Sequence, residues 1–250
     1  MSAFERALEV GADIIETDLH STADEHLVLA HDETGTRMAG QPVAIRDVSL
    51  AELSTWDAGW GFVGKHGGRP YAGRGHRVPT LGEALSAFPH ARFNIDIKDP
   101  RPRVVSQLLA HLRAQGAESR VRLASFYTRA VTLVRARGYR GETSLSRTEF
   151  LLALLAPAGL FRRLPLTGSA AQIPVSADPQ GRVRFDTERV IAKCHRAGLR
   201  VDFWTINEPE KAAELVGRGA DGIITDDPAG LYAAVKGEFA PGSHPAPARR

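Results

Sequence analysis

The sequence has little cysteine and no long apolar run. Its one cysteine, Cys194, excludes an intramolecular disulfide framework and a cysteine-based zinc site. The longest apolar stretch, residues 150–161, is too short to cross a bilayer as a helix, and we expect a core-facing helix or a lid there. No signal-peptide pattern opens the chain. We therefore expect a cytoplasmic protein without stable membrane insertion.

Lysine is also scarce, since 27 of the 32 basic residues are arginine, and the net charge is a mild +3. No run of basic residues interleaved with aromatics stands out, so we expect no nucleic-acid partner. A scatter of arginines remains compatible with binding a single phosphate group. The charge therefore favours a small-molecule substrate over a polyanion, and the sequence leaves the oligomeric state open.

A length of 250 residues and a hydrophobic content of 43% suit one large α/β domain. From residue 93 onwards, strand patterns alternate with helix patterns across short links, which favours a parallel sheet. Capping boxes at Ser49 and Thr80 predict two earlier helix starts. We predict a TIM (β/α)8-type barrel over residues 1–236 and a disordered tail at 237–250. A doubly wound sheet ranks second, because no glycine-rich phosphate loop follows any strand.

One feature of this barrel is irregular, because a barrel unit runs strand first and helix second. The chain opens on a helix pattern at 4–10, and about seven clear strands follow. We therefore expect that the first strand of the barrel is missing from the chain. A start site further upstream would supply it, and a lost signal peptide remains open for the same reason.

Acidic and basic side chains stand where the strands end. Glu16 and Asp18 lie two residues apart, so their side chains leave the same face of the strand at 14–19. His31 follows the next strand at 27–30, and Asp96 and Lys98 end the strand at 93–97. The carboxyl ends of barrel strands are where catalytic groups collect. Paired carboxylates beside a histidine indicate a metal and proton-transfer site.

The motifs resemble the glycerophosphodiester phosphodiesterase family. They are, in order, G-A-D-I-I-E-T-D-L-H, L-V-L-A-H-D, V-P-T-L-G-E-A-L, F-N-I-D-I-K, A-Q-I-P, F-W-T-I-N and D-G-I-I-T-D-D-P. Together they span nearly the whole chain. The resemblance implies a TIM-barrel hydrolase that uses a divalent cation to cleave glycerophosphodiesters into glycerol 3-phosphate and an alcohol.

The resemblance also implies roles for individual residues. Glu16, Asp18 and Asp96 match the metal-binding carboxylates of the family, although Asp96 stands where the family usually has glutamate. Three oxygen donors suit Mg²⁺ or Ca²⁺. His31 matches one of two catalytic histidines and is expected to transfer a proton at the scissile phosphate.

Other matched side chains have a functional and a structural interpretation. Lys98 is expected to neutralise a phosphate oxygen, or to be a plain salt-bridge partner. Trp204 is expected to pack on the glycerol or alcohol moiety, or to be core. His20 belongs to the substrate site or hydrogen-bonds within its wall. For Asp226 and Asp227 we favour capping of the last helix.

The second catalytic histidine of the family lies in an H-R-G motif, which this sequence lacks. One missing partner in general acid–base catalysis predicts a rate loss of roughly 10²–10⁴. The main expectation is a metal-dependent phosphodiesterase. The alternatives are a non-catalytic relative that binds phosphodiesters without turnover, and a phospholipase-D-like hydrolase of lipid head groups. The apolar stretch at 150–161 is what supports the last alternative.

Overall fold

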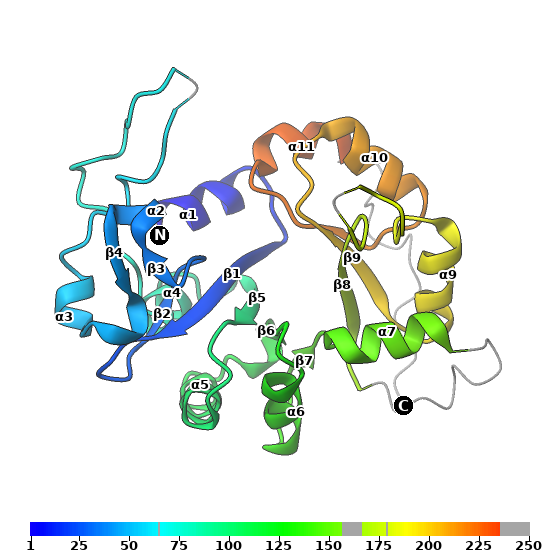
Figure 1. Ribbon diagram of the computed structural model, residues 1–250, viewed down its shortest axis with the longest axis horizontal. Coiled ribbons are helices and arrows are strands. Elements are labelled where there is room, and N and C mark those ends of the chain that lie inside the picture. Colours follow the sequence, from blue (N-terminus) through cyan, green and yellow to red (C-terminus); the bar gives the residue numbers. More distant parts are fainter. Residues whose placement is uncertain (65, 157–166, 179, 236–250) are drawn as a thin grey trace. The chain divides into compact units, whose positions relative to one another are not determined.

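The fold of residues 1–64, 66–156, 167–178 and 180–235 is given by a computed structural model (Figure 1). Two compact units make up this part of the chain. Unit 1 contains Met1 and Glu16–Gly141, and unit 2 contains Ser2–Ile15 and the chain from Glu142 onwards. The tail predicted to be disordered, 237–250, lies outside the described residues. A single domain over 1–236 stays a prediction.

The sheet of unit 1 contains four strands in the order β2-β1-β5-β6. They are β1 (Ile14–Ser21), β2 (Leu27–Leu29), β5 (Arg92–Ile97) and β6 (Val121–Ala124). The pair β5 and β6 is parallel, with Phe93 opposite Val121. The pair β1 and β2 is antiparallel, with Leu19 opposite Leu29. β1 and β2 therefore form a hairpin rather than part of a parallel array.

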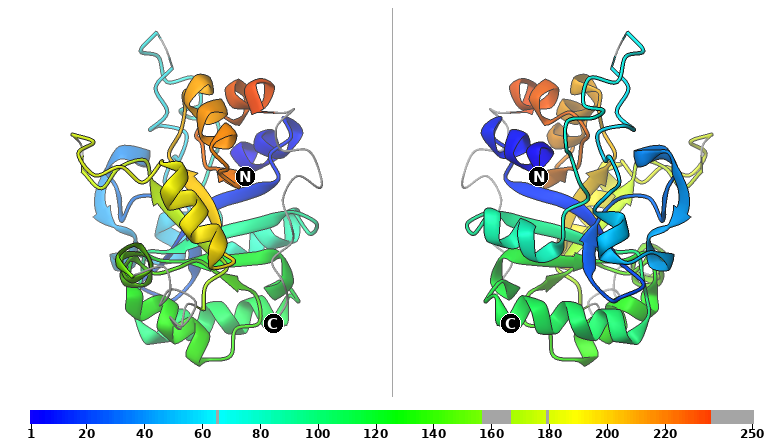
Figure 2. Two further views of the ribbon diagram at one scale, coloured as in Figure 1. Left: turned by 90° about the vertical axis from the view of Figure 1, so that its right-hand side faces the viewer. Right: turned by 90° about the vertical axis from the view of Figure 1, so that its left-hand side faces the viewer.

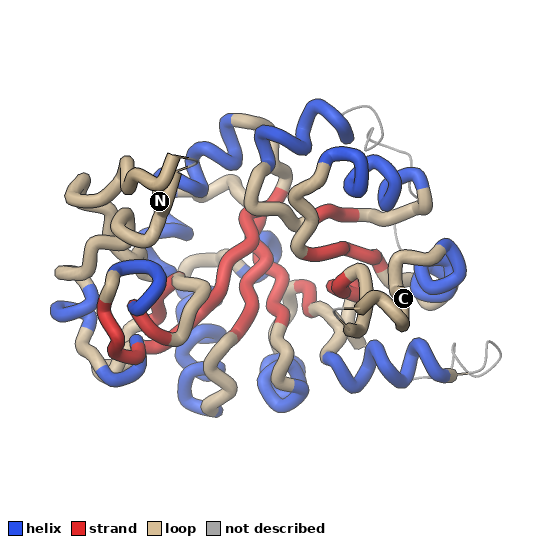
Figure 3. Tube along the Cα trace, turned by 45° about the horizontal axis from the view of Figure 1, so that its top comes forward, coloured by secondary structure: helices blue, strands red, loops and turns tan. Residues whose placement is uncertain are grey.

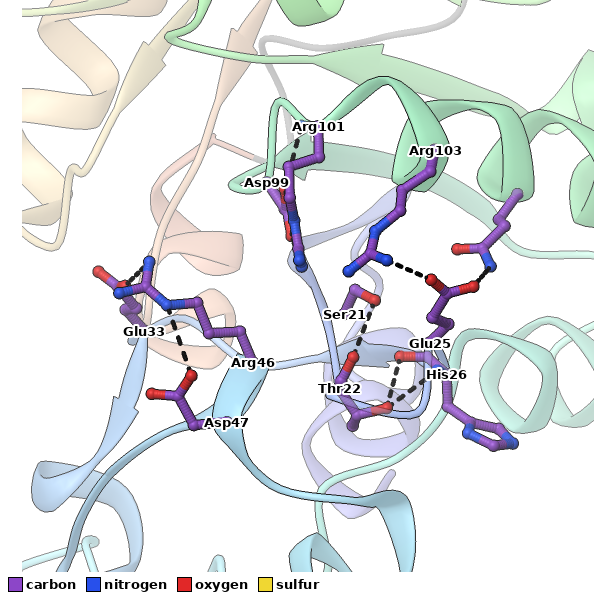
Figure 4. A network of polar contacts seen from close by, with 11 residues as sticks. Ser21, Thr22, Glu25, His26, Glu33, Arg46, Asp47, Asp99, Arg101 and Arg103 are labelled. Carbon is purple, nitrogen blue, oxygen red and sulfur yellow. Dashed lines mark hydrogen bonds and ion pairs between the residues drawn. The ribbon is translucent and has the colours of Figure 1, made fainter.

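The turn of this hairpin is fixed by local and distant contacts (Figure 4). The Thr22 hydroxyl accepts a hydrogen bond from the His26 backbone at 2.9 Å, and Glu25 adopts a positive φ of 67°. The Glu25 carboxylate contacts Arg103 at 2.6 Å and Gln107 at 2.9 Å, both on helix α5 (Pro102–Ala114). These contacts hold the hairpin against the helix that follows β5.

Helices pack on the sheet of unit 1 through apolar faces. In Figure 2, α5 and α6 (Thr128–Ala136) lie side by side below the strands. Their buried side chains include Leu108, Leu109 and Val131. The remaining elements of this unit are β3 (Thr34–Gly35), α2 (Thr36–Ala39), β4 (Gln41–Ala44), α3 (Leu50–Leu53) and α4 (Leu81–Ala87), with 3₁₀ turns at Ile45–Asp47 and Glu118–Arg120. Both predicted capping boxes, Ser49 with Glu52 and Thr80 with Glu83, are confirmed.

Unit 2 is built on three parallel strands in the order β10-β9-β8 (Figure 3). They are β8 (Ala170–Pro174), β9 (Arg200–Trp204) and β10 (Gly222–Ile223). Its core includes Ala171, Val201, Phe203 and Leu215. The other elements are α1 (Ser2–Glu9), β7 (Glu142–Thr143), α7 (Arg147–Leu155), α9 (Glu188–Arg196), α10 (Pro209–Gly217) and α11 (Pro228–Val235).

Helix α7 covers the described start of the apolar stretch at 150–161. Phe150 and Ala153 are buried, as expected for a core-facing helix, whereas Leu152 and Leu155 on the same helix are exposed. Residues 157–161 of the stretch lie outside the described part of the chain. Within the described ranges, no helix combines the length and apolar character that a membrane span requires.

Candidate functional site

The site is built on the neighbouring strands β1 and β5. Asp18 lies on β1 and Asp96 on β5, and both side chains are buried. The Lys98 backbone donates to the Leu19 carbonyl at 3.1 Å, which fixes the end of β5 beside β1. Asp96 and Lys98 are two residues apart, so their side chains leave the same face.

The Lys98 ammonium lies between the two buried carboxylates. Its Nζ is 2.8 Å from Asp18 Oδ1 and 2.6 Å from Asp96 Oδ2. The same nitrogen lies 5.6 Å from the ring centroid of Phe126, which is exposed. A quarter of the Lys98 side chain remains accessible. We call Asp18, Asp96 and Lys98 the Lys98 cluster; it combines buried anions with a cation that solutes can reach.

The charges of the Lys98 cluster are incompletely compensated. Burial raises the pKa of Asp96 and the Asp18 carboxylate raises it further, while Lys98 acts in the opposite direction. Burial alone would lower the pKa of Lys98, but the hydrogen bonds to both carboxylates outweigh it and raise the pKa. Within the described residues, Asp96 Oδ1 is buried without a hydrogen-bond partner. A buried carboxylate oxygen in this state costs free energy unless a ligand or proton satisfies it.

His20 lies on β1 beside this cluster. Its ring is buried, and Nε2 is 3.5 Å from the carbonyl oxygen of His31. Burial lowers the pKa of His20, and the nearby Asp18 carboxylate offsets part of this effect. The lowered pKa disfavours the charged form of the ring. The role of His20 in the substrate site or its wall stays a prediction.

His31 is exposed, and a carboxylate orients its ring. His31 Nδ1 is 2.7 Å from Asp32 Oδ1, and Arg37 Nε donates to Asp32 Oδ2 at 2.7 Å. The hydrogen bond from Arg37 and that from His31 lower the pKa of Asp32 to about 2. An ionised Asp32 accepts the Nδ1 proton, which leaves Nε2 as the basic nitrogen that faces solvent.

The hairpin explains why His31 comes close to the acidic strand. Because β2 runs antiparallel to β1, the Ala30 backbone donates to the Asp18 carbonyl at 3.0 Å, and His31 follows directly. The sequence predicted that His31 lies near the carboxylates because parallel strands end at one edge. The backbone contact of Ala30 puts His31 beside β1, but the parallel arrangement expected for this pair of strands was wrong. The catalytic role of His31 stays a prediction.

Two site residues missed in the sequence are Asp32 and Arg37. Asp32 follows His31 directly and Arg37 is the second residue of the next helix, so proximity in the sequence was the available signal. Asp226 and Asp227 contact groups of unit 2: Asp227 Oδ1 accepts from the Gly230 backbone at 2.9 Å, and Asp226 accepts from the Asn207 side chain at 3.0 Å. The Asp227 contact agrees with the capping expected at the last helix.

The remaining predicted site residues lie on two different strands. Glu16 is exposed on β1, two residues before Asp18. Trp204 ends β9 in unit 2, where it pairs with Pro174 and is half-buried. Among the described residues, no group of three or more His, Cys, Asp or Glu side chains is arranged to hold a metal ion. Asp18 and Asp96 nevertheless suit a cation, because they already share the Lys98 ammonium and Asp96 Oδ1 has no partner in the described structure.

Most of the chain is similar to one family of phosphodiesterases. Residues 1–230 match the glycerophosphoryl diester phosphodiesterase family. A glycerophosphodiester phosphodiesterase of Caldanaerobacter subterraneus is 30% identical over 242 residues, which are 94% of this chain and 91% of that protein. The chain belongs to the glycerophosphoryl diester phosphodiesterase family. The resemblance of its motifs is thereby confirmed.

Solved structures confirm the fold. A putative glycerophosphoryl diester phosphodiesterase from Silicibacter pomeroyi matches with a TM-score of 0.76 at 22% identity, over 95% of this chain and 88% of that one. An Oleispira antarctica phosphodiesterase in complex with its product sn-glycerol-3-phosphate matches with a TM-score of 0.73 at 19% identity, over 94% and 90%. The predicted α/β fold of the TIM-barrel type is therefore correct, while the absence of its first strand stays a prediction.

Proposed function

We propose that this chain hydrolyses glycerophosphodiesters to glycerol 3-phosphate and an alcohol. The observation that carries the proposal is the pairing of the Lys98 cluster with His31, which is oriented by Asp32, on one β-hairpin and its neighbouring strand. Family membership supports the reaction class. The relative from Caldanaerobacter bears the name of this activity, and the Oleispira structure holds its product.

In this reaction, Lys98 and His31 have separate tasks. The accessible part of Lys98 neutralises a non-bridging phosphate oxygen of the substrate, whose charge increases in the transition state. His31 moves a proton through Nε2, because Asp32 holds the proton on Nδ1. Asp32 does not need to change its own protonation, since its pKa is about 2. Its role is to fix the tautomer and the orientation of the ring.

Asp18 and Asp96, with Glu16 as the third carboxylate, would hold a divalent cation. Oxygen donors of this kind suit Mg²⁺ or Ca²⁺. When bound, such a cation supplies charge stabilisation at the phosphate. Addition of Mg²⁺ or Ca²⁺ should raise the melting temperature of the wild-type chain, because a ligand of the folded state stabilises it. The Asp18→Asn variant should show a smaller shift, and an equal shift would remove Asp18 from the ligand set.

The hairpin itself offers a matched control for His31. His26 also lies next to the hairpin, also contacts an aspartate (Asp24, 3.4 Å) and is also exposed. Glycerol 3-phosphate release from glycerophosphocholine should fall roughly 10²–10⁴-fold in His31→Gln and stay near wild type in His26→Gln. Equal losses of activity in both variants would mean that replacing either histidine impairs folding, and that His31 has no special role in catalysis. Wild-type release from His31→Gln would disprove the role of His31.

A phospholipase-D-like activity on lipid head groups remains the alternative hypothesis. The exposed leucines of α7 are compatible with contact to lipid. Release of the head group from a lysophospholipid, measured beside release from glycerophosphocholine, distinguishes the two substrates. Faster turnover of the lysophospholipid would favour the alternative.

A further inference from the structure

A loop between α3 and α4 extends away from the other elements of unit 1 (cyan in Figures 1 and 2). We call residues 59–64 and 66–77 the aromatic–basic loop. Its described residues include three aromatic side chains and three arginines, and none is Asp or Glu: Trp60, Phe62, Tyr71, Arg69, Arg74 and Arg77. The proposed hydrolysis uses none of these side chains.

Hydrogen bonds hold the loop in one shape. At its base, the Asp57 carboxylate accepts from the Gly59 backbone at 3.0 Å and the Gly73 backbone at 2.6 Å. At its tip, the Gly64 backbone donates to the Gly68 carbonyl at 2.8 Å. Because the base and the tip are both closed, the side chains between them are presented together. Less conformational entropy is then lost when they bind a surface.

The apolar side chains of the loop are exposed side by side. Phe62 and Val63 are each 53% exposed, and the Tyr71 ring packs on the Phe62 ring with centroids 4.9 Å apart. Isolated exposed apolar residues need no explanation, but an exposed group of neighbours indicates an interaction site. Aromatic side chains of this kind prefer the boundary between water and lipid.

The charge on the loop has one sign. Arg69, Arg74 and Arg77 are exposed, and the described loop residues include no Asp or Glu. The carboxylates near the loop lie at its base: Asp57 accepts from the Gly73 backbone, and Glu83 of α4 interacts with Arg77. A surface that combines apolar side chains with arginines complements a membrane that exposes anionic phosphates. Near such a membrane, each arginine strengthens binding by about fivefold.

The ring contacts argue against nucleic acid as the partner. The Arg69 guanidinium covers the Trp60 ring at 3.7 Å, and Phe62 and Tyr71 pack edge to face. Bases of single-stranded nucleic acid stack on open aromatic faces. In this loop, Arg69 covers one face of Trp60 and the edge-to-face pair leaves Phe62 and Tyr71 without a parallel stack, whereas the exposed Val63 is aliphatic and suits burial in an apolar medium. A lipid surface therefore fits better.

We propose that the aromatic–basic loop is a peripheral docking site for a phospholipid surface that contains anionic head groups. Phe62, Val63 and Tyr71 enter the head-group region, and Arg74 and Arg77 bind lipid phosphates. Arg69 remains on Trp60 and supports the shape of the loop, since it also donates to the Trp60 carbonyl oxygen. The docking does not depend on the proposed hydrolysis.

The test is co-sedimentation of the full chain with vesicles of phosphatidylcholine and phosphatidylglycerol, beside vesicles of phosphatidylcholine alone. We expect at least tenfold stronger binding to the mixed vesicles, and its loss in high salt, because salt screens the arginines. The double variant Arg74→Gln/Arg77→Gln should bind the mixed vesicles about 25-fold more weakly. Its matched control is Arg137→Gln/Arg140→Gln, which removes two exposed arginines elsewhere in unit 1 and should bind like wild type.

A second variant, Phe62→Ala/Val63→Ala, keeps all charges and should also weaken vesicle binding by at least tenfold. These vesicles contain no glycerophosphodiester, so hydrolysis does not affect the result. Equal binding by wild type and both loop variants would overturn the proposal, as would absence of binding by wild type. Retention of a single-stranded oligonucleotide in place of the vesicles, with the same dependence on Arg74 and Arg77, would overturn it in favour of nucleic acid.

Discussion

Asp96 in unit 1 and Asp186 in unit 2 are both buried aspartates that contact a lysine, but their pKa values shift in opposite directions. Asp186 contacts Lys211 at 2.7 Å, Arg218 at 3.3 Å and Arg184 at 2.8 Å. The hydrogen bonds from Arg184 and Lys211 outweigh burial and hold the pKa of Asp186 far below its usual range. Asp96 shares one lysine with Asp18, and its pKa is raised. We call Asp186 and its three cations the Asp186 cluster.

The difference distinguishes an ion cluster whose charges the protein itself compensates from one that has the properties of a ligand site. The Asp186 side chain is fully buried and compensated, so its charge is already satisfied by the protein. In the Lys98 cluster, one carboxylate oxygen has no partner within the described residues and the lysine is accessible. Incomplete compensation of this kind is typical of sites that bind a ligand or transfer charge.

The largest expected effect on stability concerns the Asp186 cluster. In Asp186→Asn, three partly exposed cations lose the buried carboxylate that they share. Because water still reaches these cations, we expect a loss of about 1.5–3 kcal/mol of unfolding free energy, the range for hydrogen bonds to charged groups. Urea unfolding measures this cost. A loss below about 1 kcal/mol would show that the cluster does not stabilise the fold.

The same cluster predicts an acid-dependent loss of stability. Because the pKa of Asp186 is lowered in the folded state, its contribution is fully present above the ordinary carboxyl pKa of about 4. As pH falls below that value, the contribution is progressively lost. The unfolding free energy of wild type should therefore fall more steeply below about pH 4 than that of Asp186→Asn. If the unfolding free energies of wild type and Asp186→Asn fell in parallel with pH, Asp186 would not be the source of the acid-dependent loss.

Lys98→Met should strongly reduce activity. Loss of a preorganised charge at a phosphate oxygen costs about 10²–10³ in kcat. Lys193→Met is a matched control in unit 2, because the Lys193 ammonium contacts the carbonyls of Leu154 and Ala156, both at 2.7 Å. Glycerol 3-phosphate release is the measurement. Equal losses of activity in the two variants would mean that replacing a lysine impairs folding and not the chemistry at the phosphate.

Asp32→Asn should have a smaller effect. An asparagine can still contact His31, but it no longer has a negative charge to hold the proton on Nδ1. Changes to groups that orient a functional histidine in metal sites cost about 10–100-fold, and we expect a loss of that size in kcat. The pH profile should also change, whereas a purely structural role of Asp32 would leave its shape unaltered.

Much of unit 1 could be predicted from the sequence because the signals were local. The capping boxes at Ser49 and Thr80 each fix a helix start within four residues, and the two-residue spacing of Asp96 and Lys98 fixes their common face. The antiparallel pairing of β1 and β2 was missed although a signal existed. The link at 22–26 is five residues long, which is too short for a parallel crossover and suits a hairpin.

Other features depend on tertiary contacts and could not be predicted. From the sequence, Lys98 was expected to contact either a phosphate oxygen of the substrate or an acidic side chain. Its position between Asp18 and Asp96 follows from the pairing of β1 with β5 and could not be predicted. The Asp186 cluster joins residues 184, 211 and 218, which no local pattern connects. The roles of Glu16 and Trp204 stay predictions.

The most direct test of the comparison is glycerol 3-phosphate release from glycerophosphocholine by Asp96→Asn, in protein whose urea unfolding is recorded in parallel. Because the Asp96 carboxylate is incompletely compensated, we expect the unfolding free energy to change by less than about 1 kcal/mol. Release should nevertheless fall by about 10² or more. A variant that is as active as wild type, or as destabilised as Asp186→Asn, would contradict a functional role for the Lys98 cluster.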